Sequence, residues 1–146
     1  MSMVEVAFSP LPAHVRTARL VAVAVARRSG VPDSLLDEVR LAVGEACSRA
    51  VEAHREHCPA KPVKIELTES GGRFEVVVTD AAPGAGVPPA QAAAKSNGTG
   101  TENGHGGLQD GLGLAVIAEL ADDVKISRTA GGISVSMSWP SSPGEG

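Results

Sequence analysis

The stretch "LAVGEACSRAVEAH", Leu41 to His54, decides how the chain is interpreted. Its small apolar residues recur at the spacing of an amphipathic helix, yet Glu45 and Arg49 lie one turn apart among them. An i, i+4 pair of this kind on an exposed helix face contributes about 0.2–0.5 kcal/mol and needs no further explanation. The alternative is that both side chains line a site, and the rest of the sequence has to decide between the two.

The composition is that of one globular domain. The chain has 146 residues, of which 42% are hydrophobic and 21% are charged, so most of it can form a packed core. Aromatic residues make up only 2% of the chain, which disfavours a base-stacking surface. The net charge of −4 argues against binding to a phosphate backbone. We predict a single domain over residues 1–140, a polar tail at 141–146, and no nucleic-acid partner.

No apolar run is long enough to predict a membrane span. The longest, "LVAVAVA" from Leu20 to Ala26, is flanked by Arg19 and Arg27 and is far shorter than the roughly 18 residues that a spanning helix needs. The protein is therefore expected in the cytoplasm and away from the membrane, with its two cysteines as reduced thiols.

Periodicity and turn signals predict an alternation of helices and hairpins. The expected elements are a strand at 4–10, a helix at 13–28 that Gly30 ends, a helix from an N-cap at Asp33 to about His57, strands at 63–69 and 73–80 around Gly71-Gly72, a helix at 112–122, and strands at 123–129 and 133–139. This mixture predicts an α+β fold, a two-layer sandwich of a mostly antiparallel sheet and helices.

Residues 81–110 interrupt this pattern. They are rich in Gly, Ala, Pro, Ser and Asn and contain almost no large apolar side chains. An insert of this length within a compact domain is usually a functional lid or a disordered segment. We predict a flexible lid.

Three features lie on predicted elements that suit a binding site. Glu45 lies within the long helix, Asp80 ends a strand, and "GLGL" (Gly111 to Leu114) opens a helix directly after the lid. Glycines at a helix N-terminus let backbone N–H groups approach phosphates, and the helix dipole favours the anion. A carboxylate at a strand end can accept a hydrogen bond from a nucleobase amine. Together these features outline a nucleotide pocket.

With these motifs the sequence resembles the histidine-kinase-like ATPases of the Bergerat fold, and within them the small bacterial anti-sigma factor serine kinases of the partner-switching type. "LAVGEACSRAV" is similar to the family's Glu-x-x-x-Asn helix, "VVVTDAAPGAG" to its Asp-x-Gly-x-Gly box and "GLGLAVIAELAD" to its Gly-x-Gly-Leu box. The resemblance gives Glu45 the place of a general base. It assigns ATP binding to Glu45, Arg49, Asp80, Gly84, Gly111, Leu112, Gly113 and Leu114.

Two positions depart from the family pattern. Arg49 replaces the family's magnesium-binding Asn, and Ala82 replaces the first glycine after Asp80. A guanidinium has five donors and no acceptor, so Arg49 cannot coordinate Mg²⁺. It can meet the phosphates in place of the metal, or it can pair with Glu45 and block the pocket.

The resemblance therefore implies a homodimeric partner-switching regulator with weak or lost kinase activity. Its implied partners are a sigma factor, a STAS-domain anti-anti-sigma protein, or both. ATP binding is then weak or absent, and Mg²⁺ binding is doubtful. The alternative is an active serine kinase that phosphorylates the STAS antagonist with Mg-ATP.

A metal site is a weaker interpretation of the same helix. His54, His57 and Cys58 lie close together near its end, but their spacing fits no usual zinc site and no second cluster of ligands follows. We predict no metal site and interpret these residues as a polar helix end.

Overall fold

The computed structural model describes residues 2–82, 115–129 and 131–142. Alternating apolar and polar residues form strands, and stripes at helical spacing form helices. In chain order the elements are β1 (Ser2–Phe8), α1 (Pro12–Arg28), α2 (Asp33–His57), β2 (Val63–Ser70), β3 (Arg73–Thr79), β4 (Asp123–Thr129) and β5 (Gly132–Pro140). Residues 115–120 are also helical. Within the described ranges, this is the predicted order of elements.

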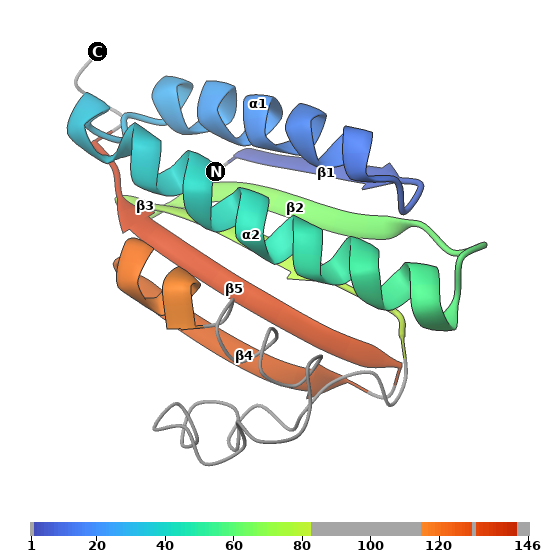
Figure 1. The fold of residues 1–146 in the computed structure, drawn as a ribbon. Helices are drawn as coiled ribbons and strands as arrows, with labels where there is room; N and C mark the ends of the chain where they lie inside the picture. The colour runs from blue at the N-terminus through green and yellow to red at the C-terminus, as the bar shows by residue number, and fades with distance from the viewer. Residues whose placement is uncertain (1, 83–114, 130, 143–146) are drawn as a thin grey trace.

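The five strands form one sheet in the order β1-β2-β3-β5-β4, and every neighbouring pair is antiparallel. Figure 1 shows α1 and α2 lying side by side on one face of this sheet. The predicted α+β fold, a two-layer sandwich of helices on an antiparallel sheet, is confirmed. None of the helices in the described ranges is long and apolar enough to cross a membrane.

The core lies between the sheet and the helices, and it is mostly aliphatic. On β3 and β5 alternate residues are buried: Phe74, Val76, Val78, Val135, Met137 and Trp139. The rings of Phe74 and Trp139 lie against each other with centroids 6.2 Å apart. Trp139 also donates its indole N–H to the backbone carbonyl of Leu120, 3.2 Å away. This bond ties the helical segment at 115–120 to β5.

Small residues let α1 and α2 approach closely. The buried face of α1 consists of Val15, Ala18, Ala22 and Ala26. On α2, Gly44 leaves space for the side chain of Arg19, because a Cβ at that position would lie 2.6 Å from Arg19 Cδ. The side chain of Arg19 therefore lies against α2 at Gly44.

The start of α2 differs by one residue from the prediction. The N-cap is Pro32 rather than Asp33, and no side chain caps the helix. Asp33 is instead the first helical residue, where its negative charge lies in the first turn and interacts favourably with the helix dipole.

Gly132, at the start of β5, permits the close approach of β5 to the end of β3. A Cβ at Gly132 would collide with the backbone carbonyl oxygen of Asp80 and lie 2.6 Å from its Oδ1 atom.

We expect Gly132→Ala to lower the free energy of unfolding by about 1–3 kcal/mol, as overpacking does. Urea unfolding measures it. Gly131→Ala is the control, because its Cβ would meet nothing within 4 Å; an equal loss in both variants would contradict the explanation.

The buried thiol of Cys47 makes stability depend on alkaline pH. Burial raises the pKa of this thiol from 9.0 to about 12, and the nearby Arg19 lowers it only in part. The folded chain thus keeps a proton that the unfolded chain loses, so stability is full below pH 9 and falls as the pH rises from 9 towards 12. The Cys47 contribution to the free energy of unfolding should fall by about 1.4 kcal/mol between pH 8 and pH 10. Denaturant titrations at both pH values should show this extra loss in the wild type and not in Cys47→Ala. Equal pH dependence in the two proteins would contradict it.

Candidate functional site

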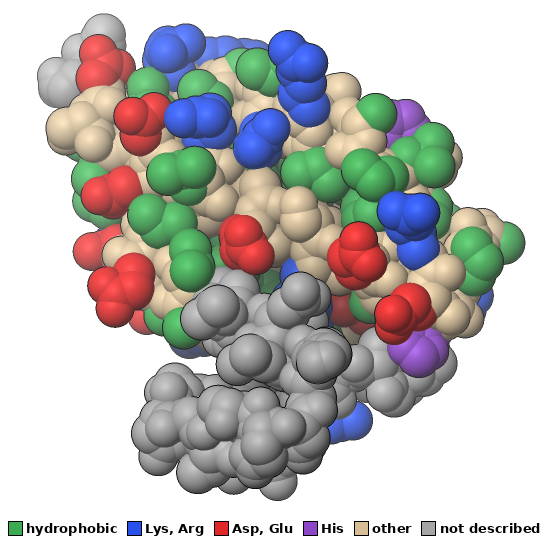
Figure 2. Space-filling view, viewed as in Figure 1, with side chains coloured by type: hydrophobic (Ala, Val, Ile, Leu, Met, Phe, Trp, Pro, Cys, Tyr) green, Lys and Arg blue, Asp and Glu red, His purple; other side chains and the backbone are tan. Residues whose placement is uncertain are grey.

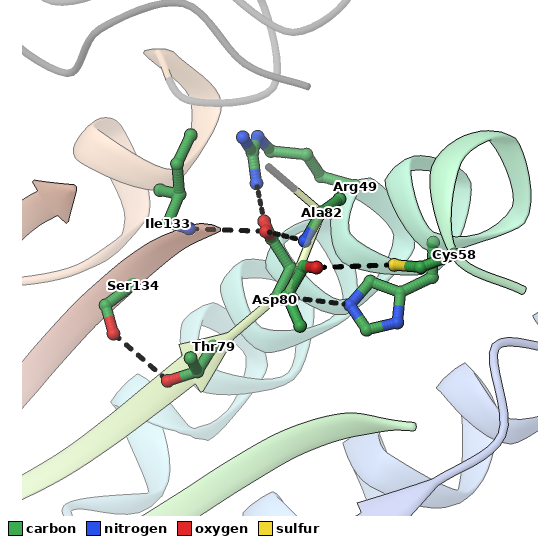
Figure 3. Close-up of polar contacts among 9 residues, drawn as sticks. Arg49, Cys58, Thr79, Asp80, Ala82, Ile133 and Ser134 are labelled. Carbon is green, nitrogen blue, oxygen red and sulfur yellow. Dashed lines mark hydrogen bonds and ion pairs between the residues drawn. The ribbon is translucent and has the colours of Figure 1, made fainter. Parts of the chain in front are cut away.

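A buried ion pair joins α2 to the end of β3. Arg49 Nη1 lies 3.2 Å from Asp80 Oδ2, and the two side chains are only 7% and 1% exposed. Figure 3 shows the Arg49 side chain reaching from α2 over Asp80 and Ala82. Two opposite charges so far from water stabilise each other strongly, whereas either charge alone would be costly to bury. Arg49 therefore supplies the opposite charge that compensates the buried carboxylate of Asp80.

Backbone donors complete the environment of Asp80. Its Oδ1 atom accepts hydrogen bonds from the backbone N–H of Ala82 at 3.1 Å and of Ile133 at 3.2 Å. The backbone N–H of Asp80 in turn donates to the carbonyl of Ile133 at 2.9 Å. Both carboxylate oxygens thus have partners, which come from α2, from the segment after β3 and from β5 (Figure 3).

His54, also on α2, fixes the next residue along the chain. The ring is fully buried; Nδ1 lies 2.8 Å from the carbonyl of Lys61, and Nε2 lies 2.8 Å from the backbone N–H of Ala81. Because Nε2 must accept from that N–H, we assign the proton to Nδ1, which donates to Lys61. Cys58 donates from Sγ to the Ala81 carbonyl at 3.4 Å. Ala81 is thereby held through both of its backbone polar groups.

These contacts leave the His54 ring without a free nitrogen for a metal. Elsewhere in the described part of the chain, no group of three or more His, Cys, Asp and Glu side chains is arranged to hold a metal ion.

The structure corrects one hypothesis for Arg49. The pair with Glu45 suggested by their spacing does not form, because the partner of Arg49 is Asp80. Glu45 lies half-buried one turn earlier on α2 and makes no ion pair with another described residue. Its carboxylate is therefore not neutralised by Arg49. Within the described part of the chain Arg49 itself is incompletely paired, since its buried Nε atom has no hydrogen-bond partner there.

Of the residues predicted to bind a nucleotide, the structure brings Arg49 and Asp80 into contact and places Glu45 on the same helix. Gly84, Gly111, Leu112, Gly113 and Leu114 lie outside the described residues. So does most of the predicted lid, although Ala81 and Ala82 at its start are described, and Ala82 is 1% exposed.

Sequence reasoning missed the role of His54, which was interpreted as part of a polar helix end. One signal could have revealed it: His54 follows Ala50 by four residues, so it continues the buried stripe of α2. A histidine in that stripe needs hydrogen-bond partners, and the end of β3 provides one of them.

The arrangement offers a buried carboxylate whose oxygens accept and a guanidinium that only donates. The carboxylate of such a pair can hold a group that donates hydrogen bonds, either the guanidinium of Arg49 or another donor that takes its place. Arg49 cannot ligate Mg²⁺ at the position where the family resemblance places an asparagine.

Comparison with known proteins shows the family to which the chain belongs. The model of the histidine kinase-like ATPase domain family matches residues 8–139, which is most of the chain. Among the curated proteins compared with the chain, none is a significant match. In fold, the chain is similar to the crystal structure of the RsbU and RsbW domains of Rv1364c from Mycobacterium tuberculosis, with a TM-score of 0.67 and 17% sequence identity. That match covers 97% of this chain but only 32% of the other, so the chain spans about a third of its length. The chain belongs to the histidine kinase-like ATPase domain family.

Proposed function

We propose that the protein is a partner-switching regulator that binds other proteins and transfers little or no phosphate. By its resemblance to the anti-sigma factor serine kinases, its partners are a sigma factor, a STAS-domain anti-anti-sigma protein, or both. The family membership and the fold support this proposal at the level of the domain.

The observation that carries the proposal is the buried contact between Arg49 and Asp80. Phosphoryl transfer depends heavily on a metal that neutralises the developing charge on the β- and γ-oxygens. Arg49 occupies the position of the family's metal ligand and supplies no acceptor atom. It also takes one oxygen of the carboxylate that resemblance assigns to the nucleobase. Both ends of an ATP site are thus altered by one substitution.

One observation favours the alternative of an active serine kinase. Glu45 is half-buried and makes no ion pair with Arg49, so its carboxylate is available as a general base. This alternative requires Mg-ATP to bind in spite of Arg49, and a binding measurement separates the two.

The docking surface that we propose for protein partners lies on α1. The helix carries Arg16, Arg19, Arg27 and Arg28 and no acidic residue. None of these arginines makes an ion pair with another described residue. Leu20 is 62% exposed between them. Figure 2 shows Lys and Arg side chains gathered at the top of the view, over α1. An acidic partner surface with an apolar centre is complementary to this face.

The proposed function predicts how the protein binds ATP. The wild type should bind ATP weakly and with little dependence on Mg²⁺, because Arg49 holds no metal and occupies Asp80. Arg49→Asn supplies a carbonyl oxygen and releases Asp80, so it should strengthen Mg²⁺-dependent ATP binding by roughly tenfold or more. Calorimetric titration of both proteins, with Mg²⁺ and with a chelator, measures this.

Arg55→Asn is the matched control, because Arg55 is an exposed arginine of the same helix without an ion pair among the described residues. It should titrate like the wild type. Tight, Mg²⁺-dependent binding by the unmodified protein would overturn the proposal and favour the kinase.

The proposed function also predicts that the arginines of α1 contribute to partner binding. Co-purification from the source cells should recover a sigma factor or a STAS-domain protein, and the purified partner can then be titrated. Replacing Arg16 and Arg27 together with Glu should weaken that complex by roughly tenfold at low salt and less at high salt. The control is the same double reversal at Lys125 and Arg128, which are exposed on β4. Equal effects of both reversals would show that only net charge matters and that α1 is not the docking face.

A further inference from the structure

We infer that the carboxylate of Asp80 is a preformed acceptor site and that the chain occupies this site with its own Arg49. The site is then held in its occupied arrangement without any nucleotide. The inference rests on the proposed function, because it describes how the same pocket is regulated, and it goes beyond it by making Arg49 an internal ligand.

The residues around Asp80 fix the position of its carboxylate. Ala82 and Ile133 direct two backbone N–H groups at Oδ1, which leaves Oδ2 facing the guanidinium of Arg49. Ala81, between Asp80 and Ala82, is itself held by His54 and Cys58. The carboxylate is thus fixed by contacts that do not involve Arg49. If Arg49 were removed, these contacts would keep an ionised oxygen pointing into the vacated space.

Arg49 makes fewer hydrogen bonds than a buried arginine in a purely structural ion pair usually makes. A structural guanidinium buried to this degree usually has all its donors paired. Here one Nη atom meets Oδ2 at 3.2 Å, and the buried Nε atom has no hydrogen-bond partner among the described residues. The charge of Asp80 is therefore compensated, while the hydrogen-bonding capacity of Arg49 is only partly used.

The consequence is regulatory. Arg49 comes from α2, Asp80 follows β3, and Ile133 belongs to β5, so the ion pair and its backbone donors tie these three elements together. At an acceptor site that needs an external donor, occupancy controls how these elements are held. Here the donor is covalently part of the chain, so the ion pair holds the three elements together without any external ligand.

Chemical rescue tests this directly. Arg49→Ala removes the internal cation and leaves Asp80 buried and unpaired, so its melting temperature should fall by roughly 10 °C. Methylguanidinium, at up to roughly 50 mM to stay below denaturing concentrations, should then bind beside Asp80. It should raise the melting temperature of Arg49→Ala saturably, by roughly 4 °C. The wild type, whose pocket is filled, should show no increase.

The controls separate a specific pocket from a general effect of charge. Tetramethylammonium carries the same charge but no N–H donor, so it should not stabilise Arg49→Ala. Arg49→Met combined with Asp80→Asn removes both charges, and methylguanidinium should not stabilise it. If Arg49→Ala is unfolded, Arg49→Met is used in its place, because its unbranched apolar chain replaces the methylene stem of Arg49.

Three results would overturn the inference: a melting temperature of Arg49→Ala equal to that of the wild type, no stabilisation by methylguanidinium in either single variant, or equal stabilisation by tetramethylammonium. These outcomes are distinguishable from failure of the proposed function. Rescue depends only on Arg49 and Asp80, whereas partner binding is measured on the wild type. Failed rescue with intact partner binding would reject the internal ligand alone.

Discussion

The buried carboxylate of Asp80 is the constraint on which this part of the structure depends. An ionised carboxyl that is 1% exposed has to be compensated, because an unpaired charge in the interior costs several kcal/mol. Arg49 supplies the opposite charge, and the backbone N–H groups of Ala82 and Ile133 supply hydrogen bonds. The side chain of Asp80 thereby joins α2, the end of β3 and the start of β5, which lies more than fifty residues further along the chain.

Most of the fold could be predicted because its signals are local. The strands alternate apolar and polar residues, and the turn of the β2–β3 hairpin is marked by Gly71 and Gly72, both of which have positive φ angles. Helix ends are less certain, because capping depends on the conformation of one residue. At the start of α2 the capping conformation belongs to Pro32, which moves the boundary by one residue relative to the prediction.

The candidate site could be predicted only in part, because its decisive contact is not local. Glu45 and Arg49 suggest a pair one helical turn apart, and such a pair is worth only a few tenths of a kcal/mol in water. Asp80 is 31 residues away from Arg49, and only the folded arrangement brings it near. In the interior the attraction between the two charges is far stronger than at the surface, so Arg49 pairs with Asp80 instead of Glu45. The partners of His54 could not be predicted for the same reason, since one of the two backbone groups that it contacts belongs to residue 81, although the buried stripe of α2 indicated that the ring is buried.

On the function proposed above, the two activities that the family resemblance combines belong to different elements of the fold. Every described side chain that grips the Asp80–Ala82 segment comes from α2 or from the residue directly after it: Arg49, His54 and Cys58. The arginine face proposed for partners lies on α1, which contributes no hydrogen bond to that segment. A change at position 49 can therefore abolish metal-dependent chemistry without altering a single side chain of the docking face. Retention of protein binding with loss of catalysis then requires no new scaffold, because the proposed docking face and the Asp80 site lie on different elements.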